Sequence, residues 1–390
     1  MTRRLSKSCN QENINELMMA ASECNVRLLR KLFREGATTS ARDKQGKNVI
    51  YHAFANTPET KELVELFQVL GESGVDFNSN LDLDGCSALI TAATLDWPEV
   101  VQILITFGAD VNDQGMPKFG AFVSTDLSMQ GYGDQVNQTV GDKDRFIFSK
   151  GCGQSVSPLL CAIMLKRQVI TDILLSAGAD CQQMSVGSFW RSSRIGACSV
   201  CDVSVNAIHL AAYKGEDRLL QKLLDVCQKK SLETHRDTKK PFVSCLSSEY
   251  ELTPLWLALL RGETDAVKTL LAYDHPRAPP CLFGSGLYIA VEEGHFELAK
   301  ILMLSGYNIN EDMEWIESES YPTGNKDMKD FIRNFCCEPQ ALLIICRDVL
   351  RCHMGPRLSS YLKMINVPQK IQDLLLLKEI LSCEELNSSK

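Results

Sequence analysis

The strongest constraint on the fold is a short phrase that recurs along the chain with small changes. Its copies are SALITAA at 87–93, SPLLCAI at 157–163, NAIHLAA at 206–212, TPLWLAL at 253–259 and SGLYIAV at 285–291. Each begins with a small or capping residue, followed by Leu or Ile and then by Ala. Ser157 and Thr253 can accept hydrogen bonds from the free N–H groups of a helix start, and the proline after each suits the first helical position. Each phrase therefore predicts the start of a helix.

A second apolar segment follows each phrase with the period of an amphipathic helix. Apolar residues recur at i, i+3 and i+4 in the segments 99–110, 168–180, 217–226, 265–274 and 297–310. In three copies a glycine lies 21 positions after the capping serine, in the pairs Ser87 and Gly108, Ser157 and Gly178, and Ser285 and Gly306. Glycine is favoured there because helices commonly end in a left-handed turn. The sequence thus predicts stacked pairs of antiparallel helices, each pair burying one face on the next.

These phrases resemble the ankyrin repeat, which reads T-P-L-H-x-A before a helix and closes with a G-A-D-x-N turn. TPLWLA, NAIHLA, GADVN and GYNIN carry the resemblance. Segments 13–48 and 48–80 look like two divergent copies, so residues 1–310 are expected to form an all-α solenoid of about seven repeats. The resemblance also implies that His209 makes a hydrogen bond to the neighbouring repeat.

The repeats are unevenly spaced, and insertions near 113–155, 181–205 and 228–250 take up the excess. We expect surface loops there, because the longest of them is rich in Gly, Ser and Asp. Insertions in helical arrays gather on one face, which often binds partners. Aromatic residues in these segments are candidate anchors for a target protein, namely Phe119, Phe122, Tyr132, Phe146, Phe189 and Trp190.

A different pattern follows residue 310. Residues 311–334 are polar and acidic and are interpreted as a connector, 335–383 as a second helical domain, and 384–390 as a short tail. In the second domain Leu342, Cys346 and Leu350 recur at every fourth position, while Arg347 and Arg351 occupy the other side of the helix. Residue chemistry alone favours an apolar stripe that caps the end of the array.

The same domain resembles the SOCS box. Its Leu-x-x-x-Cys-x-x-x-Leu spacing, followed by RCHMGPRL, is similar to the part of that box that docks on elongin C. The resemblance implies that Leu342 enters an apolar pocket of elongin C, with Cys346 packed beside it. Val349 and Leu350 complete the residues expected in that interface.

The cullin-selecting element of the SOCS box corresponds to INVPQKIQDLL at 365–375. The residues that keep its pattern, and are the candidates for Cullin-5 binding, are Ile365, Val367, Pro368 and Ile371. Asn366 stands where the family has Pro, and Leu374 where it usually has Tyr. Elongin binding is therefore better supported than Cullin-5 binding.

The two patterns together resemble the ankyrin-repeat and SOCS-box proteins. That resemblance implies the substrate-recognition subunit of an elongin B/C–Cullin-5–RING E3 ubiquitin ligase, whose repeats bind a target and whose SOCS box binds elongin C. Such a chain needs no catalytic residue, because the recruited enzyme acts on a target held close by. The alternative is an ankyrin-repeat scaffold or inhibitor whose last helices only cap the array.

Composition and motifs narrow the remaining classes. Apolar residues at 45%, charged residues at 23% and a formal charge of -8 describe an ordinary globular chain without a basic stripe for nucleic acid. The sequence has no P-loop, H-E-x-x-H or G-x-S-x-G motif, and CSVC at 198–201 lacks a second metal-binding pair, so no catalytic, cofactor or metal site is expected. The N-terminus does not read as a secretory signal. We therefore expect a cytoplasmic or nuclear protein with reduced cysteines and no membrane partner.

Overall fold

The computed structural model describes residues 2–55, 60–115, 144–147, 156–192, 198–234, 252–274, 284–317, 326–337, 340–365 and 367–382. The chain divides into two compact units, Met1–Asp202 and Val203–Lys390. Both are built mainly from short helices, as the repeat pattern predicts. Seven helix pairs, α1/α2 to α13/α14, follow one another in the described part of the chain.

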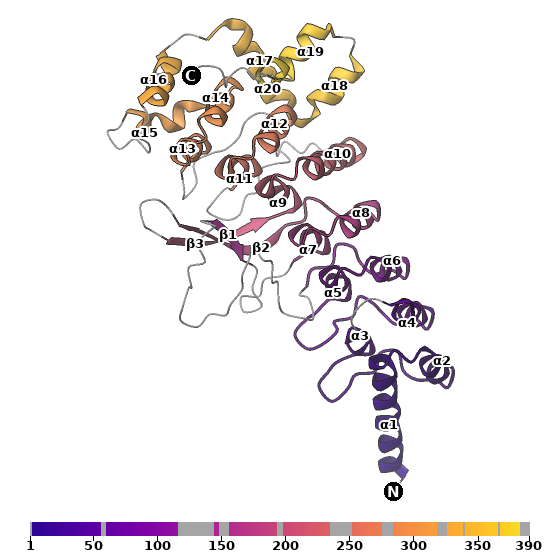
Figure 1. Ribbon diagram of the computed structural model, residues 1–390. Coiled ribbons are helices and arrows are strands. Elements are labelled where there is room, and N and C mark those ends of the chain that lie inside the picture. Colours follow the sequence, from indigo (N-terminus) through magenta and orange to yellow (C-terminus); the bar gives the residue numbers. More distant parts are fainter. Residues whose placement is uncertain are drawn as a thin grey trace. The chain divides into compact units, whose positions relative to one another are not determined.

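The first unit contains four of these pairs, arranged as two parallel rows of helices (Figure 1). One row holds the first helix of each pair and the other row holds the second. In the first row α1 packs on α3 and α5 on α7, and in the second row each helix from α2 to α8 packs on the next. The helices are α1 (Thr2–Ser22), α2 (Val26–Arg34), α3 (Val49–Ala53), α4 (Lys61–Glu72), α5 (Ala88–Leu95), α6 (Pro98–Thr106), α7 (Pro158–Met164) and α8 (Gln168–Ser176).

Local sequence signals account for where these helices begin and end. The Ser157 hydroxyl accepts the Leu160 N–H at 3.2 Å, and Pro158 is the first helical residue of α7. After α6 and α8, Gly108 and Gly178 have φ angles of +88° and +89°, in the left-handed region that glycine favours. Both helix-start and helix-end predictions are confirmed here.

The inserted segments contribute a small antiparallel sheet that the sequence analysis did not predict. Strands β1 (Asp144–Ile147), β2 (Ser185–Ser192) and β3 (Cys198–Val205) lie in the order β1-β2-β3. In the register of the first pair, Phe146 lies opposite Phe189 and Arg145 opposite Trp190. Segments about forty residues apart in sequence therefore meet in one element rather than as separate loops.

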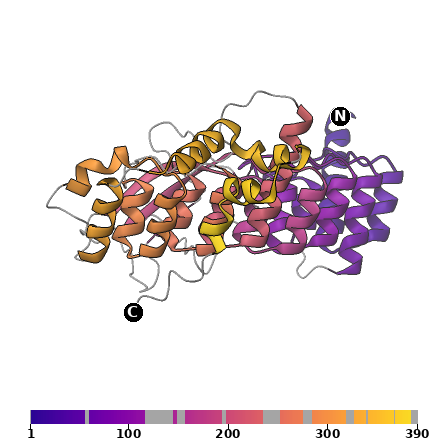
Figure 2. The ribbon, with the colours of Figure 1, turned by 90° about the horizontal axis from the view of Figure 1, so that it is seen from above.

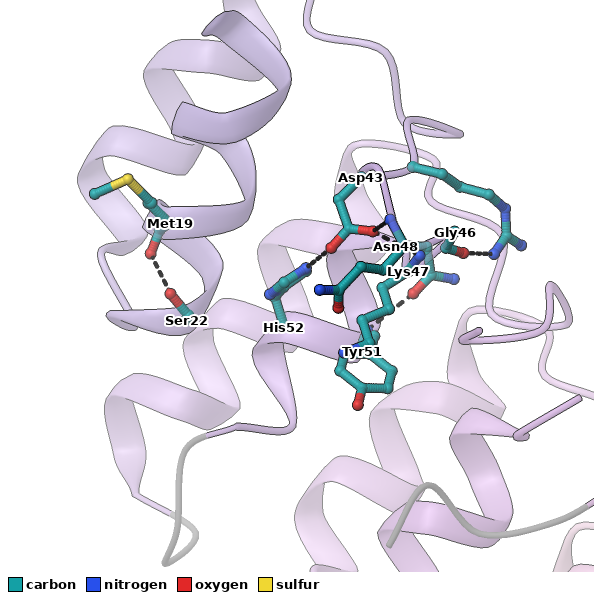
Figure 3. A network of polar contacts seen from close by, with 10 residues as sticks. Met19, Ser22, Asp43, Gly46, Lys47, Asn48, Tyr51 and His52 are labelled. Carbon is teal, nitrogen blue, oxygen red and sulfur yellow. Dashed lines mark hydrogen bonds and ion pairs between the residues drawn. The ribbon is translucent and has the colours of Figure 1, made fainter. Parts of the chain in front are cut away.

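A polar network joins the turn before α3 to that helix (Figure 3). The Asp43 carboxylate accepts the backbone N–H groups of Gln45 at 2.7 Å and Lys47 at 3.0 Å. Its other oxygen contacts His52 Nε2 at 3.0 Å. Burial by itself raises the pKa of Asp43, but these backbone hydrogen bonds and His52 outweigh it and hold the pKa below its ordinary value.

The second unit begins with three more helix pairs. They are α9 (Ala207–Lys214) with α10 (Asp217–Thr234), α11 (Pro254–Arg261) with α12 (Thr264–Tyr273), and α13 (Gly286–Glu292) with α14 (Phe296–Leu304). The first helices of these pairs pack on one another, and so do the second helices. Trp256 is fully buried in α11 and donates its indole N–H to the Gly284 carbonyl at 3.0 Å, which joins α11 to the next repeat.

The chain ends in a further set of helices beside the last repeats (Figure 2). They are η1 (Ile309–Asp312), α15 (Met313–Glu317), α16 (Lys326–Cys337), α17 (Leu342–Met354), η2 (Gly355–Arg357), α18 (Leu358–Met364), α19 (Gln369–Leu375) and α20 (Lys378–Ser382). Leu358, Leu362 and Leu375 form a core between α18 and α19, and α20 packs against α12 and α14. The tail therefore has its own small core and also contacts the array.

Within the described residues, no helix is both long and apolar enough to cross a bilayer.

The described cysteines differ in their state. Cys161 is fully buried, and burial raises the pKa of its thiol to about 11. Cys181 in the first unit and Cys227 in the second are each in a disulfide bond, contrary to the expectation of reduced cysteines.

Candidate partner-binding surface of the tail

Helix α17 carries the residues predicted to bind elongin C. It begins after Ala341, whose backbone is extended, and ends at Gly355, where φ is +53°. Its last turn contains Arg351 and His353, and a basic residue is favourable at a helix C-terminus.

The polar side of α17 faces inward. Arg347 and Arg351 are only 4% and 1% exposed. Arg351 donates to the carbonyl oxygens of Leu375 at 2.6 Å and Asp274 at 2.8 Å, and also to that of Leu271. Burial lowers the pKa of Arg351 to about 10, partly offset by the Asp274 carboxylate, so the guanidinium stays charged at neutral pH.

Arg347 makes a second contact with the array. Its Nη2 donates to the Leu304 carbonyl at 2.8 Å, and its Nε donates to the adjacent Asp348 carboxylate at 2.7 Å. Asp348 in turn lies against Gly306, where an added Cβ would come within 2.5 Å of the carboxylate carbon. Two charged residues and a close backbone approach therefore hold α17 to the end of α14.

The apolar side of α17 faces solvent. The exposed fraction is 75% for Leu342, 51% for Val349 and 46% for Leu350, and Cys346 between them is exposed too. Leu343 and Ile345 widen this surface, so that at 100° per residue it covers about 160° of the helix circumference. We call the set Leu342, Leu343, Ile345, Cys346, Val349 and Leu350 the apolar stripe.

This orientation corrects the interpretation that the stripe packs on the array. A buried arginine can replace an apolar contact when carbonyl oxygens accept its N–H groups, and here three carbonyls surround Arg351. The apolar residues then have no place on the array side. The stripe is left as an unusually apolar exposed helix face for a globular chain.

The residues predicted to bind Cullin-5 lie around the turn between α18 and α19. Ile365 and Ile371 are 54% and 46% exposed, and Pro368 is exposed as well. Val367 is half-buried against the Leu358, Leu362 and Leu375 core. Ile365, Pro368 and Ile371, together with exposed Met364, give this turn an apolar surface of its own.

The predicted target-binding residues are only partly described. Phe119, Phe122 and Tyr132 lie outside the described residues. Phe146 is in β1, and Phe189 and Trp190 are in β2, where the strand register places Phe146 opposite Phe189. The structure thus brings two of the predicted insertions into one sheet.

His209 makes the predicted hydrogen bond between repeats. Its Nε2 donates to the Leu252 carbonyl at 3.1 Å, just before the next helix pair, and its Nδ1 accepts the Asn206 N–H at 3.4 Å. Complete burial lowers the pKa of His209 to about 4, despite the opposing effect of the Leu252 hydrogen bond. The ring is therefore neutral at physiological pH and serves as a structural link.

Stacked pairs of short helices with these caps, turns and inter-repeat hydrogen bonds define a helical-repeat solenoid. A family model described as ankyrin repeats (3 copies) matches residues 17–116 and 208–313, which is more than half of the chain. The chain belongs to the ankyrin-repeat family. A search of curated proteins finds no match. Ankyrin repeats are modules for binding other proteins, and that is the activity the family indicates.

The sequence pattern of the tail does not indicate the buried roles of Arg347 and Arg351. One related feature can be seen in the sequence, namely that the glycine expected after α12 is missing, but only the fold shows that Arg351 lies at this helix end. Helices α2, α4, α6, α8 and α14 are each followed, two positions after their last residue, by a glycine with positive φ. At the same place after α12 the sequence has His275, so this helix lacks the glycine turn.

Proposed function

We propose that this chain is the substrate-recognition subunit of an elongin B/C–Cullin-5–RING E3 ubiquitin ligase. The ankyrin repeats bind a target protein, and the apolar stripe of α17 binds elongin C. The chain supplies no catalytic residue in this scheme. It raises the effective concentration of the target's lysines near the ubiquitin-charged enzyme.

The observation that carries the proposal is the outward orientation of the apolar stripe. Full burial of a Leu or Val side chain is worth about 1.5–3 kcal/mol, so each of these half-exposed residues forgoes about 1 kcal/mol in the free chain. A partner with an apolar groove would recover that free energy at several positions at once. Leu342, predicted to enter the elongin C pocket, is also the most exposed of the large apolar residues in the stripe.

The cullin part of the proposal has a separate support. Ile365, Pro368 and Ile371 are exposed around one turn, next to the core formed by Leu358, Leu362 and Leu375. A cullin docked there would contact a surface distinct from the stripe. The target-binding part rests on the inserted segments, two of which pair as β1 and β2.

The alternative function, an ankyrin-repeat scaffold or inhibitor with a capping tail, also has an observation in its favour. Arg347 and Arg351 hold α17 against α12 and α14, so the tail does cover the end of the array. In that alternative, however, the apolar stripe serves no purpose. Elongin binding separates the two, since only the ligase subunit requires it.

The test is titration of the purified chain with the elongin B–elongin C pair by isothermal calorimetry. Leu342→Asp would place an unpaired charge in the elongin C pocket. The loss of Leu burial alone predicts binding weaker by about tenfold to hundredfold, and the charge weakens it further. Its melting temperature should stay close to that of the natural chain, because Leu342 is 75% exposed.

Val169→Asp is the matched control, since Val169 is a helical residue of the first unit and is 62% exposed. It should bind the elongin pair like the natural chain. A folded natural chain that shows no binding would rule out the proposed function and leave the capping alternative. Equal binding by Leu342→Asp and the natural chain would show that the stripe is not the binding surface.

A further inference from the structure

Helix α12 ends in a different way from α2, α4, α6, α8 and α14, the second helices of five other repeats. After α2, α4, α6, α8 and α14 a glycine in the left-handed conformation turns the chain, whereas α12 ends at Asp274 in an extended conformation, with φ -140° and ψ 171°. A helix leaves its last carbonyl groups without partners inside the helix. The Asp274 N–H donates to the Leu270 carbonyl, while the carbonyls of Leu271 and Asp274 accept hydrogen bonds from a donor elsewhere in the chain.

Arg351 provides that donor from the tail. One of its terminal nitrogens donates to the Leu271 carbonyl and to the Asp274 carbonyl, the latter at 2.8 Å, while the other donates to the Leu375 carbonyl at the end of α19. The C-terminal end of a helix carries partial negative charge, which suits a guanidinium. A single side chain thus joins α12 of the array, α17 and α19.

Arg347 acts one turn earlier on the next repeat. It donates to the Leu304 carbonyl, the last residue of α14, at 2.8 Å. The two arginines are four positions apart and lie on the same face of α17, opposite the apolar stripe. Their contacts therefore determine both where α17 lies and which way the stripe faces.

We infer that Arg351 and Arg347 are positioning residues, which cap array helices α12 and α14 from the tail and so fix the direction of the apolar stripe relative to the last repeats. These arginine contacts do not depend on any partner. Their role in a ligase rests on the proposed function: they would hold a target bound to the repeats at a fixed distance and direction from the elongin-bound enzyme. A flexible tail would allow elongin binding but not a fixed geometry.

The experiment measures the distance between the array and α17 in the full-length chain. Nitroxide labels are attached through noncanonical amino acids at two exposed positions, Asp265 in α12 and Cys352 in α17, and read by double electron–electron resonance. The natural chain should give one narrow distribution. Arg351→Met, which keeps the apolar stem but removes the guanidinium, should give a broader one with a second population.

Two further variants make the result specific to the guanidinium. Arg351→Lys retains the charge but not the planar fork, so it should narrow the distribution part of the way back. Arg333→Met removes an exposed arginine from α16 in the same unit and should leave the distribution unchanged. If Arg351→Met does not fold, Arg347→Met carries the test and should also broaden the distribution.

The inference is wrong if the measured variant, Arg351→Met or else Arg347→Met, gives the same narrow distance distribution as the natural chain. Elongin titration of the same samples keeps the two proposals apart. We expect the dissociation constant of Arg351→Met for the elongin pair to stay within about threefold of the natural chain's, because the substitution leaves the apolar stripe unchanged. A change of 1.4 kcal/mol in binding free energy would instead alter it tenfold. If the natural chain does not bind the elongin pair, the proposed function is wrong, but the conclusion from the distance measurement is unaffected.

Discussion

Gly306 at the end of the array lies against Asp348 of the tail, and replacing it by alanine has two separable effects: backbone strain and a clash with that carboxylate. Gly306 ends α14 with φ +92°, a conformation strained for any residue with a side chain. An alanine Cβ would also lie 2.5 Å from Cγ of Asp348 and 2.7 Å from both carboxylate oxygens. Gly294, in the same unit, has φ +84° and nothing within 4 Å of such a Cβ.

Both substitutions therefore introduce the same backbone strain, but only Gly306→Ala also brings a Cβ against the Asp348 carboxylate. Left-handed alanine costs about 1–2 kcal/mol, offset by about 0.4–1 kcal/mol from the lower entropy of the unfolded chain, so Gly294→Ala should destabilise by about 1 kcal/mol. Gly306→Ala must in addition rotate the Asp348 carboxylate away from Arg347, whose side chain is 3% exposed and lies 2.7 Å from it. A hydrogen bond to a charged group is worth about 1.5–3 kcal/mol, which sets the expected excess.

The assay is hydrogen–deuterium exchange with mass spectrometry on the full-length chain, because it reports opening free energies segment by segment. Gly306→Ala should lower the protection of both α14 and α17, whereas Gly294→Ala should act on the array and leave α17 close to natural. If the opening free energies of α17 in the two variants agree within about 0.5 kcal/mol, the contact between Asp348 and Gly306 does not hold the tail, and the reasoning fails.

Two other predictions follow, the first from the Asp43 hydrogen bonds and the second from the proposed function. Asp43 has a lowered pKa in the folded chain, so its contribution to stability is complete above its unfolded pKa and is lost as pH falls through the folded pKa. In urea unfolding between about pH 2 and 5, Asp43→Asn should show a flatter loss of stability than Asp110→Asn, whose carboxylate accepts the Asn112 N–H; identical slopes would contradict the assignment. Ile371→Asp should abolish Cullin-5 binding to the preformed elongin complex without weakening elongin binding, measured by size-exclusion co-elution; unchanged Cullin-5 binding would remove Ile371 from the interface.

Much of the repeat architecture could be predicted because it is encoded locally. Ser157 and Thr253 accept the N–H groups of Leu160 and Trp256, which are contacts within one turn of the chain. Gly108, Gly178 and Gly306 take left-handed conformations whatever packs around them. The spacing between such signals then gives the length of a repeat.

The small sheet is a different case. Val203 and Val205 alternate with Asp202 and Ser204, which is the two-residue period of a strand. The pairing of β1 with β2, however, joins residues 144–147 to residues 188–191 across a whole helix pair. Local composition favoured loops because it carries no information on which distant segment supplies the partner strand.

The orientation of α17 could not be predicted for a similar reason. Periodicity distinguishes an apolar face from a polar face, and burial of the apolar face is the ordinary outcome. Here the carbonyls of Leu271, Asp274 and Leu304 reverse it, because they offer hydrogen bonds to arginine at helix ends. Those acceptors lie 43 to 80 residues away in sequence, and nothing in the tail itself shows that they are there.

The two faces of α17 also determine which experiments can separate the candidate functions. Deleting the tail would remove Arg347 and Arg351 from the ends of α14 and α12, so the array should lose stability whether or not a ligase is ever recruited. A capping tail predicts loss of stability on truncation, and the ligase subunit predicts the same loss, so this measurement does not separate the two functions. Substitutions confined to one face do: the stripe can be altered at Leu342 without touching the arginines, and Arg351 without touching the stripe. A stripe variant that stays folded and loses elongin is compatible only with an adaptor.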